Sequence, residues 1–460
     1  MTFQTIKPKQ WQWIATVFIF ALYLIPRLLG YLRYGMAGFG YDLGIYRRLI
    51  NLHFLGQTNT EFGFAGLSTI ARLLDASTDQ ILVYGYIGVF LCLALGVFAV
   101  MKKSSYPHLA LWAFLLLSVS TVQFEFFSWY YFRNAIAVVF LLLSYTLFER
   151  RSPLLFLPLA SIGILHPLSL IPILLVFGWI ALREKTSRWY LVRQSGIGLV
   201  IAIATQWHEL ARYVLVAMSS SGRVANTASW QQNELTGQFL EPLQYLLLST
   251  PFLPFAIFGA IKHWKKELFW SLFAVANIVL ILAQVLLYRR FFVFLDLTII
   301  IFASYGVNDL WQAETHRRMV RTAVILFFSL LWYQLFATAM NTPPRIEPND
   351  LVAVESMNIY GDANTVAMTI RSDYAPWLYG FTPYDIIAPG VFDINRWTED
   401  EWKTFWTTTD QDIRHTLLNR YAGKRVLIFV GMQDEYYRVL LLEDAYITKH
   451  SPSVFEYTPL

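Results

Sequence analysis

Residues 11–29, WQWIATVFIFALYLIPRLL, form a nearly unbroken apolar run. As a helix, a run of this length is long enough to cross about 30 Å of hydrocarbon. Similar runs recur as far as Met340 and are separated by short clusters of Lys and Arg. A soluble core does not contain such a series of long apolar segments. The sequence therefore predicts an α-helical, polytopic membrane protein.

Composition agrees with this prediction and excludes several kinds of partner. Hydrophobic residues make up 56% of the 460 residues, whereas charged residues make up only 15%. The net charge of +5 requires no nucleic acid partner, because Lys and Arg collect in the cytoplasmic loops of membrane proteins. Cys92 is the sole cysteine, so neither a disulfide framework nor a thiolate metal site is expected.

The basic clusters also predict the orientation of the chain in the inner (plasma) membrane. Even numbers of crossings separate them if all of them lie in the cytoplasm. The N-terminus is then cytoplasmic, the C-terminal part is outside, and lipid surrounds about eleven spans. A break is expected at His166, because Pro167 cannot continue a helix. The expected spans are near 11–29, 79–101, 108–124, 131–148, a pair within 153–182, 194–212, 240–261, 268–287, 291–307 and 319–339.

The chain divides into two expected domains. Residues 1–340 form the transmembrane domain, which includes a long first outer loop over 30–79. Residues 341–460 have the composition of a soluble α/β domain and are expected outside the cytoplasm. The patterning predicts an amphipathic helix within 62–74, strands at 365–371 and 425–430, and helices at 398–408 and 411–421.

The first outer loop contains two acids that can carry chemistry. Asp42 stands in GFGYDLGIYRR (38–48), just past the outer end of the first span. A carboxylate there can accept a proton from an incoming hydroxyl, although a helix cap or turn aspartate is the structural alternative. Glu61 offers a second acid in the same loop, or else a solvated acid in the first turn of a helix. Two carboxylates so far apart give little support for a divalent metal, and we expect no cofactor.

Arginines on the outer side violate the positive-inside trend. Arg133 opens the fourth span in YYFRNAIA (130–137), and Arg289 and Arg290 precede the span at 291–307. A guanidinium group suits a phosphate because it can donate two parallel hydrogen bonds. The alternative is that these side chains reach toward lipid headgroups. Taken together, the outer arginines predict an anionic ligand at the outer leaflet.

Two further polar residues lie within apolar segments. His166 stands at the predicted helix break, where it is either a hydrogen-bonded packing residue or part of the wall of a substrate cavity. We give packing the greater weight and keep His166 as a candidate for substrate binding. Asp296 lies inside the span at 291–307, where it either pairs with a neighbouring arginine or faces another helix.

The sequence lacks the motifs of soluble nucleotide chemistry. It contains no glycine-rich phosphate loop, no dinucleotide fingerprint and no cluster of metal ligands. Direct use of ATP or of a soluble nucleotide-sugar is therefore not expected. A donor that already resides in the membrane fits better.

These features resemble those of the GT-C glycosyltransferases. The resemblance rests on an acid in the first outer loop, a long loop with an amphipathic helix, about eleven spans and an outer α/β domain. The segments SDYAPWLYGF (372–381) and IIAPG (386–390) are similar to outer domains of bacterial and archaeal members. The resemblance implies a polyprenyl-phosphate or polyprenyl-diphosphate sugar donor. It also implies Asp42 as the general base on the acceptor, and Arg133, Arg289 and Arg290 as ligands of the lipid phosphate.

The first 180 residues are also similar to the exopolysaccharide and O-antigen polymerases. Asp42 with Tyr46, EFGF (61–64), RNAIA (133–137) and the later His166 occur in a similar order and spacing. Both resemblances imply transfer of a hexosyl or pentosyl group from a lipid-linked donor to a glycan, lipid or protein acceptor. Direct displacement at the outer face would invert the sugar. A transporter or flippase of lipid-linked sugars is the alternative from another class, although no internal repeat supports it.

Overall fold

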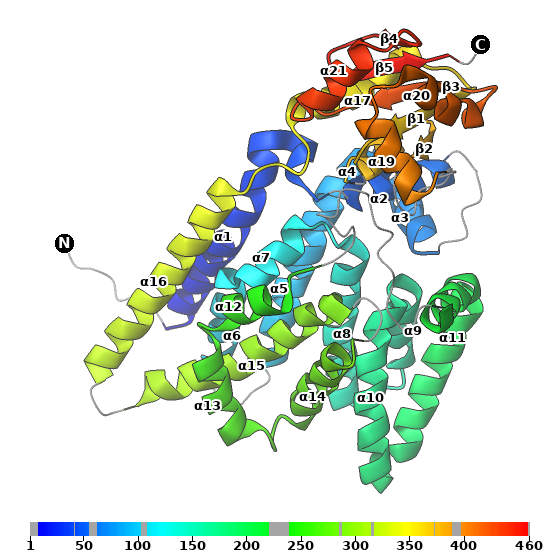
Figure 1. Cartoon of the computed structure of the whole chain (residues 1–460). Coiled ribbons are helices and arrows are strands. Elements are labelled where there is room, and N and C mark those ends of the chain that lie inside the picture. The colour runs from blue at the N-terminus through cyan, green and yellow to red at the C-terminus, as the bar shows by residue number, and fades with distance from the viewer. Residues whose placement is uncertain are drawn as a thin grey trace.

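A bundle of long helices carries a mixed α/β domain at one end (Figure 1). The computed structural model describes residues 8–40, 42–54, 62–102, 108–219, 239–284, 288–313, 317–371, 373–388 and 397–458. Shorter helices of the first outer loop lie between the bundle and the α/β domain, as Figure 1 shows. They are α2 (Asp42–Phe54), α3 (Phe62–Leu73) and α4 (Thr78–Gln80), with 3₁₀ helix η1 (Gly35–Gly38) before them and π-helix η2 (Ile81–Gly85) after them.

The helical bundle confirms a polytopic α-helical membrane protein, whereas the expected number of about eleven spans stays a prediction. Among the described residues, five helices are long and apolar enough to cross a membrane, or seven segments if each of two bent pairs counts as one span. The helices are α1 (Pro8–Tyr34), α5 (Tyr86–Lys102), α6 (Leu109–Val119), α7 (Thr121–Ser128), α8 (Phe132–Glu149), α9 (Phe156–Leu165), α10 (Pro167–Arg183), α11 (Lys185–Ser219), α12 (Pro242–Ser249), α13 (Leu253–His263), α14 (Leu268–Leu282), α15 (Phe291–Gln312) and α16 (Arg317–Asn341). The 3₁₀ helix η3 (Tyr288–Arg290) leads into α15.

Two of the expected spans are bent, which the apolar pattern did not predict. The segment expected at 108–124 turns by 56° between α6 and α7, and the one expected at 240–261 turns by 78° between α12 and α13. At the first bend Ser120 leaves the helical conformation, and its Oγ accepts a hydrogen bond from the Gln123 N–H as the N-cap of α7. At the second bend Pro251 follows the C-cap Thr250 of α12 and has no N–H to continue that helix, and Pro254 fits the first turn of α13, where no N–H is needed.

The span α15 lies at the centre of the bundle. In this helix 94% of the apolar window is buried, against 22% in α1. Glycines let α13 approach it closely. A Cβ atom on Gly259 would lie 2.0 Å from the Phe302 carbonyl oxygen, and one on Gly306 would lie 2.1 Å from the Phe255 carbonyl oxygen. Small residues at such a crossing allow backbones to pack directly in a membrane.

The C-terminal domain is built on one five-stranded sheet with the strand order β2-β1-β3-β5-β4. Strand β1 (Thr365–Thr369) runs parallel to β2 (Asp385–Ile387) and β3 (Arg425–Phe429), whereas β5 (Val454–Tyr457) runs antiparallel to β3 and to β4 (Ile447–Lys449). The helices are α17 (Pro348–Tyr360), α18 (Ala375–Phe381), α19 (Glu399–Thr407), α20 (Gln411–Leu418) and α21 (Glu435–Leu442), with η4 (Asn419–Tyr421) after α20. The strands and helices expected in this domain are thus confirmed.

Helix α2 of the first outer loop packs directly on α18. A Cβ atom on Gly44 would lie 1.9 Å from the Pro376 carbonyl oxygen, and one on Gly380 would lie 2.3 Å from the Gly44 carbonyl oxygen. Arg47 Nη1 donates to the Gly380 carbonyl oxygen at 2.8 Å, and Arg48 Nη1 donates to the Thr382 carbonyl oxygen at 3.1 Å. The loop that bears Asp42 is therefore joined to the C-terminal domain by backbone contacts that leave no room for side chains.

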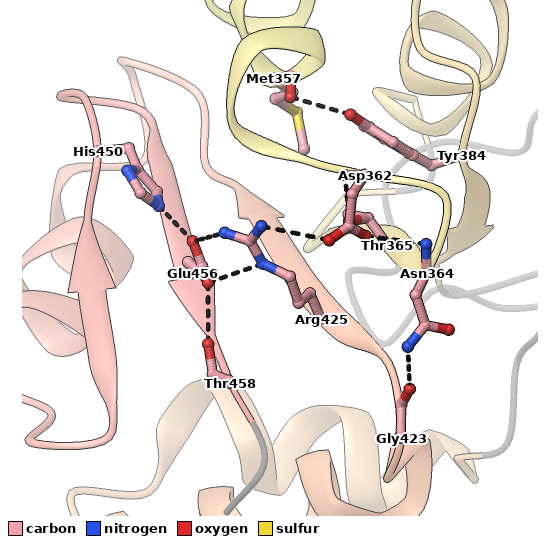
Figure 2. Close-up of polar contacts among 10 residues, drawn as sticks. All are labelled: Met357, Asp362, Asn364, Thr365, Tyr384, Gly423, Arg425, His450, Glu456 and Thr458. Carbon is pink, nitrogen blue, oxygen red and sulfur yellow. Dashed lines mark hydrogen bonds and ion pairs between the residues drawn. The ribbon is translucent and has the colours of Figure 1, made fainter.

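A charged network ties the antiparallel part of the sheet together (Figure 2). Arg425 at the start of β3 donates to both carboxylate oxygens of Glu456 on β5, at 2.9 and 2.6 Å. Glu456 also receives hydrogen bonds from Thr458 and His450. On its other side, Arg425 lies 3.6 Å from Asp362. Burial alone would raise the pKa of Glu456, but the bonds from Arg425, His450 and Thr458 hold that pKa at about 2.

Substitution of Gly306 by Ala should destabilise the bundle, because the added Cβ forces α13 away from α15. Overpacking of this kind typically costs about 1–3 kcal/mol. Thermal unfolding of the purified full chain in detergent measures the effect. The matched control is Gly178→Ala on α10, where nothing lies within 4 Å of the added atom. This control should be neutral or slightly stabilising, because Ala forms helices better than Gly. Equal losses in both variants would contradict the close-packing argument.

The C-terminal domain should lose stability as pH falls from about 4.5 to 2. Glu456 has a pKa of about 2 in the folded chain, below the ordinary value of 4.5. Its contribution is fully present above 4.5 and disappears as the folded carboxylate takes up a proton. Thermal melts across this pH range should show a flatter response in Glu456→Gln than in the native chain. The exposed Glu443→Gln is the control, and it should follow the native profile.

Candidate active site

Asp42 is the first residue of α2. Just before it in the sequence, Gly40 packs against Trp129, which lies in the turn that precedes α8. A Cβ atom on Gly40 would lie 2.2 Å from the Trp129 carbonyl oxygen, so glycine is needed for this crossing. The carboxylate is half-buried in the first helical turn, where the helix N-terminus favours a negative charge. Burial raises the pKa of Asp42 to about 6, although the positive charges of Arg290 and Arg133 oppose the rise.

Arg133 and Arg290, from two different helices, lie near enough to this carboxylate for their charges to lower its pKa. Arg133 lies in the first turn of α8, and its Nε donates to the Leu165 carbonyl oxygen at 2.7 Å. Arg290 ends η3 just before α15, and its guanidinium lies 4.9 Å from the centre of the Tyr131 ring. The charges of both arginines act on Asp42. One acid and two cations therefore share a partly buried site.

The turn that places Tyr131 and Arg133 is strained. Tyr130 has a φ of 64°, a left-handed conformation that bulky residues rarely adopt. Its side chain is buried, and its hydroxyl donates to the Leu82 carbonyl oxygen at 2.6 Å. The Arg133 N–H reaches the Tyr46 hydroxyl at 3.4 Å. Packing and hydrogen bonds thus hold a conformation that costs about 1–3 kcal/mol, and such strain collects at functional sites.

His166 joins Arg290 to the helices α8 and α10. Arg290 Nη1 lies 3.2 Å from His166 Nε2, and a guanidinium can only donate, so Nε2 is the acceptor. The ring proton is then on Nδ1, which donates to Ser169 Oγ at 2.6 Å. Ser169 Oγ in turn donates to Asn134 Oδ1 at 3.2 Å. His166 is thus buried and hydrogen-bonded, as a packing residue would be, and it also orients a guanidinium of the site.

The remaining sequence candidates lie elsewhere. Arg289 turns to Glu241 at the start of α12, with 2.5 Å between Nη1 and Oε1, so the structure does not bring it to Asp42. Asp296 pairs with no arginine among the described residues, and its Oδ2 accepts hydrogen bonds from Ser120 Oγ at 2.9 Å and Gln123 Nε2 at 2.8 Å. Glu61 lies outside the described residues.

Metal binding has no support among the residues that the structure describes. They contain no group of three or more His, Cys, Asp or Glu side chains placed to hold an ion. Because Glu61 is not among them, the expectation that the site needs no metal stays a prediction.

Several polar partners in the site were not assigned from the sequence. Asn134 and Ser169 orient His166, Tyr46 contacts the backbone of Arg133, and Tyr131 lies under Arg290. Three local signals were present, and the first two are that Asn134 follows Arg133 directly and that Ser169 is one helical turn after His166. Tyr46 is one turn after Asp42 on α2, which places both side chains on the same face.

Solved structures provide the comparison, since no protein-family model and no curated protein sequence matches this chain. ArnT from Cupriavidus metallidurans bound to undecaprenyl phosphate superposes with a TM-score of 0.60 at 10% identity, over 99% of each chain. Its apo state gives 0.58 at 12% identity, over 97% of this chain and 98% of that one. The oligosaccharyltransferase of Archaeoglobus fulgidus, in complex with zinc and sulfate, gives 0.58 at 12% identity, over 95% of this chain and 73% of its own.

The chain has the GT-C fold. The likeness spans nearly the whole length, so the bundle and the C-terminal domain belong to one architecture. Within this GT-C fold, Asp42 begins the first helix of the outer loop, and Arg133 and Arg290 stand at the same end of their helices. The site therefore lies between the bundle and the C-terminal domain, where the outer loop meets both (Figure 1).

Proposed function

We propose that this protein is a membrane glycosyltransferase of the cell envelope. It transfers a hexosyl or pentosyl group from a polyprenyl-phosphate or polyprenyl-diphosphate donor to a hydroxyl group on a glycan, lipid or protein. The observation that carries the proposal is the convergence of Asp42, Arg133 and Arg290 within a GT-C fold. ArnT, which shares this fold, was solved bound to undecaprenyl phosphate.

The three charged side chains divide the reaction between them. Asp42 accepts the proton of the acceptor hydroxyl as that oxygen attacks the anomeric carbon. The bond between the anomeric carbon and the phosphate oxygen breaks, and its electron pair stays on the phosphate. Arg133 and Arg290 stabilise the negative charge that the phosphate gains, and His166 holds the Arg290 fork in place. Direct displacement in one step inverts the configuration of the sugar.

The pKa of Asp42 suits a base that works near neutral pH. A carboxylate with a pKa of about 6 is a stronger base than an ordinary aspartate, yet it is still mostly ionised at pH 7. The two arginines contribute to this balance, because their charges oppose the rise in pKa that burial causes. The reaction asks for no metal in this scheme, since guanidinium groups neutralise the phosphate.

Polysaccharide polymerisation is the second candidate. Asp42, Arg133 and His166 belong to the pattern shared with exopolysaccharide and O-antigen polymerases, and these three residues meet in the site. Product length separates the two candidates, because a polymerase yields a ladder of chains and a single transferase yields one product. A flippase would release no free polyprenyl phosphate from a labelled lipid-linked sugar.

We also propose that the N-terminus is cytoplasmic and that the site faces outward. The alternation of basic clusters supports this orientation. A reporter that is active only outside the cytoplasm, fused after the C-terminal domain, should be active. An inactive reporter would mean that the C-terminal domain and every site residue lie on the cytoplasmic side instead.

Substitution of Asp42 by Asn should abolish turnover while the protein stays folded, because Asn keeps the shape and cannot take the proton. Loss of a general base costs about 10²–10⁴-fold in rate. In the native enzyme, turnover should rise with pH through about 6, as Asp42 loses its proton. Release of polyprenyl phosphate from a labelled donor gives the rate. Asp75→Asn, an exposed acid of the same outer loop, is the control. Near-normal turnover in Asp42→Asn would reduce Asp42 to a turn residue and pass its role to Glu61.

Substitution of Arg133 or Arg290 by Gln should weaken use of the donor by about tenfold or more, since a charge-assisted contact is worth about 1.5–3 kcal/mol. Lys should restore activity only in part, because it keeps the charge and loses the fork. The KM for the lipid-linked donor is the readout. Arg289→Gln is the comparison, and it should have the smaller effect because Glu241 already neutralises Arg289. A larger effect at Arg289 would move the phosphate site toward α12.

A further inference from the structure

Helix α9 ends at a break that leaves its last carbonyl groups in need of partners. His166 departs from the helical conformation, with φ −152° and ψ 83°, and Pro167 has no N–H to continue the hydrogen bonds of the helix. The final carbonyl groups of a helix have no partners within that helix. Ile164 and Leu165 stand directly before the break, so donors from other helices must satisfy their carbonyl oxygens.

Two side chains from neighbouring helices supply these donors. Arg133 Nε on α8 donates to the Leu165 carbonyl oxygen at 2.7 Å. Gln206 Nε2 on α11 donates to the carbonyl oxygen of the adjacent residue, Ile164, at 3.0 Å. Gln206 is only 3% exposed, and a buried acceptor that loses its donor is costly. The candidate phosphate ligand Arg133 and the buried Gln206 are thus bonded to consecutive residues of one broken helix.

Helix α11 is kinked at this glutamine. Gln206 has φ −120° and ψ 24°, which are non-helical angles in the middle of the helix. The Thr205 hydroxyl donates to the carbonyl oxygens of Ile201 at 2.8 Å and Ala202 at 3.1 Å. Hydroxyl bonds to the preceding turn often bend helices. The distortion of α11 therefore coincides with its contact to the broken end of α9.

Close packing couples α9 to α11 along their length. The two helices lie side by side (Figure 1). A Cβ atom on Gly163 would lie 2.5 Å from Ala202 Cβ, and one on Gly198 would lie 2.9 Å from Leu159 Cβ. Such glycines let helices pack closely in a membrane. A densely packed contact transmits a shift of one helix to the other.

We propose that Gln206 is a positioning residue for Arg133. Its bond to the Ile164 carbonyl fixes the end of α9, and the neighbouring Leu165 carbonyl then orients the Arg133 guanidinium. The inference rests on the proposed function, in which Arg133 binds the phosphate of a polyprenyl-linked donor. It extends the phosphate site to α11 through the backbone of α9.

The affinity for undecaprenyl phosphate tests this inference on the purified full chain in detergent. Gln206→Met keeps the length of the side chain and removes the donor, so the Ile164 carbonyl loses its partner and Arg133 is displaced. The dissociation constant should rise about fivefold, less than the tenfold or more expected when Arg133 itself is replaced. The constant is obtained from the rise in unfolding temperature with lipid concentration.

Gln194→Met is the matched control. Gln194 lies on the same helix, is 5% exposed and accepts a hydrogen bond from the Phe156 N–H at 3.3 Å, at the other end of α9. About 18 Å of helix, at 1.5 Å per residue, separates the two glutamines. This variant should lose stability much as Gln206→Met does, yet keep the native dissociation constant. A purely structural role of Gln206 predicts native affinity in both variants.

A double-mutant cycle shows whether Gln206 acts through Arg133. In the Arg133→Gln background the guanidinium is already absent, so Gln206→Met should change the dissociation constant by less than about 1.5-fold. An equal fivefold loss in both backgrounds would mean that Gln206 acts independently of Arg133, and the inference would be wrong.

The outcomes separate this inference from the proposed function. A native chain that does not bind undecaprenyl phosphate contradicts both. A native chain that binds, together with a Gln206→Met variant of native affinity, contradicts the inference alone. Should Gln206→Met fail to fold, Thr205→Val decides, because it removes the hydroxyl that supports the kink and keeps the shape of the side chain. It should weaken binding about twofold or more, and native affinity in that variant would overturn the inference.

Discussion

The hydrogen bonds to one buried carboxylate oxygen, Asp296 Oδ2, fix the position of the central span α15 along its axis relative to α7. This oxygen accepts hydrogen bonds from Ser120 and Gln123, which flank the bend between α6 and α7. In an apolar interior, donors and charges without partners are expensive, so this contact resists any sliding of α15 against α7. Arg290 stands directly before α15, and α7 leads into the turn that carries Arg133. The relative depth of the two arginines therefore depends on a bond well below them.

Charge balance at Asp42 follows from that alignment. Removal from water favours the protonated acid, and two guanidinium groups favour the ionised one, which leaves the pKa at about 6. His166 accepts a hydrogen bond from Arg290 Nη1 and so helps to orient one of these guanidinium groups. The opposed effects of burial and of the two guanidinium charges therefore set the pKa of this carboxylate together.

The length of the apolar runs predicted the helices of the bundle, and the sign of the charge at their outer ends singled out Arg133 and Arg290. Other features depend on geometry that a linear pattern does not contain. Arg289 and Arg290 are neighbours of identical type, and only the 3₁₀ turn of η3 sends one to Glu241 and the other to His166. The bend at Ser120 lies in a run that is apolar overall, so the mean hydropathy of the run does not reveal the bend. Strands of three residues, such as β2 and β4, are too short to show an alternating pattern.

The close contact of Gly44 with Pro376 and Gly380 joins α2 and α18, so these two helices must move together as one rigid unit. Backbone lies against backbone there, so no side chain can yield to absorb a change in the spacing of α2 and α18. An exchange of the C-terminal domain between related chains would therefore have to carry α2 along with α18. Any shift of the C-terminal domain in such chains would also displace Asp42, which begins α2.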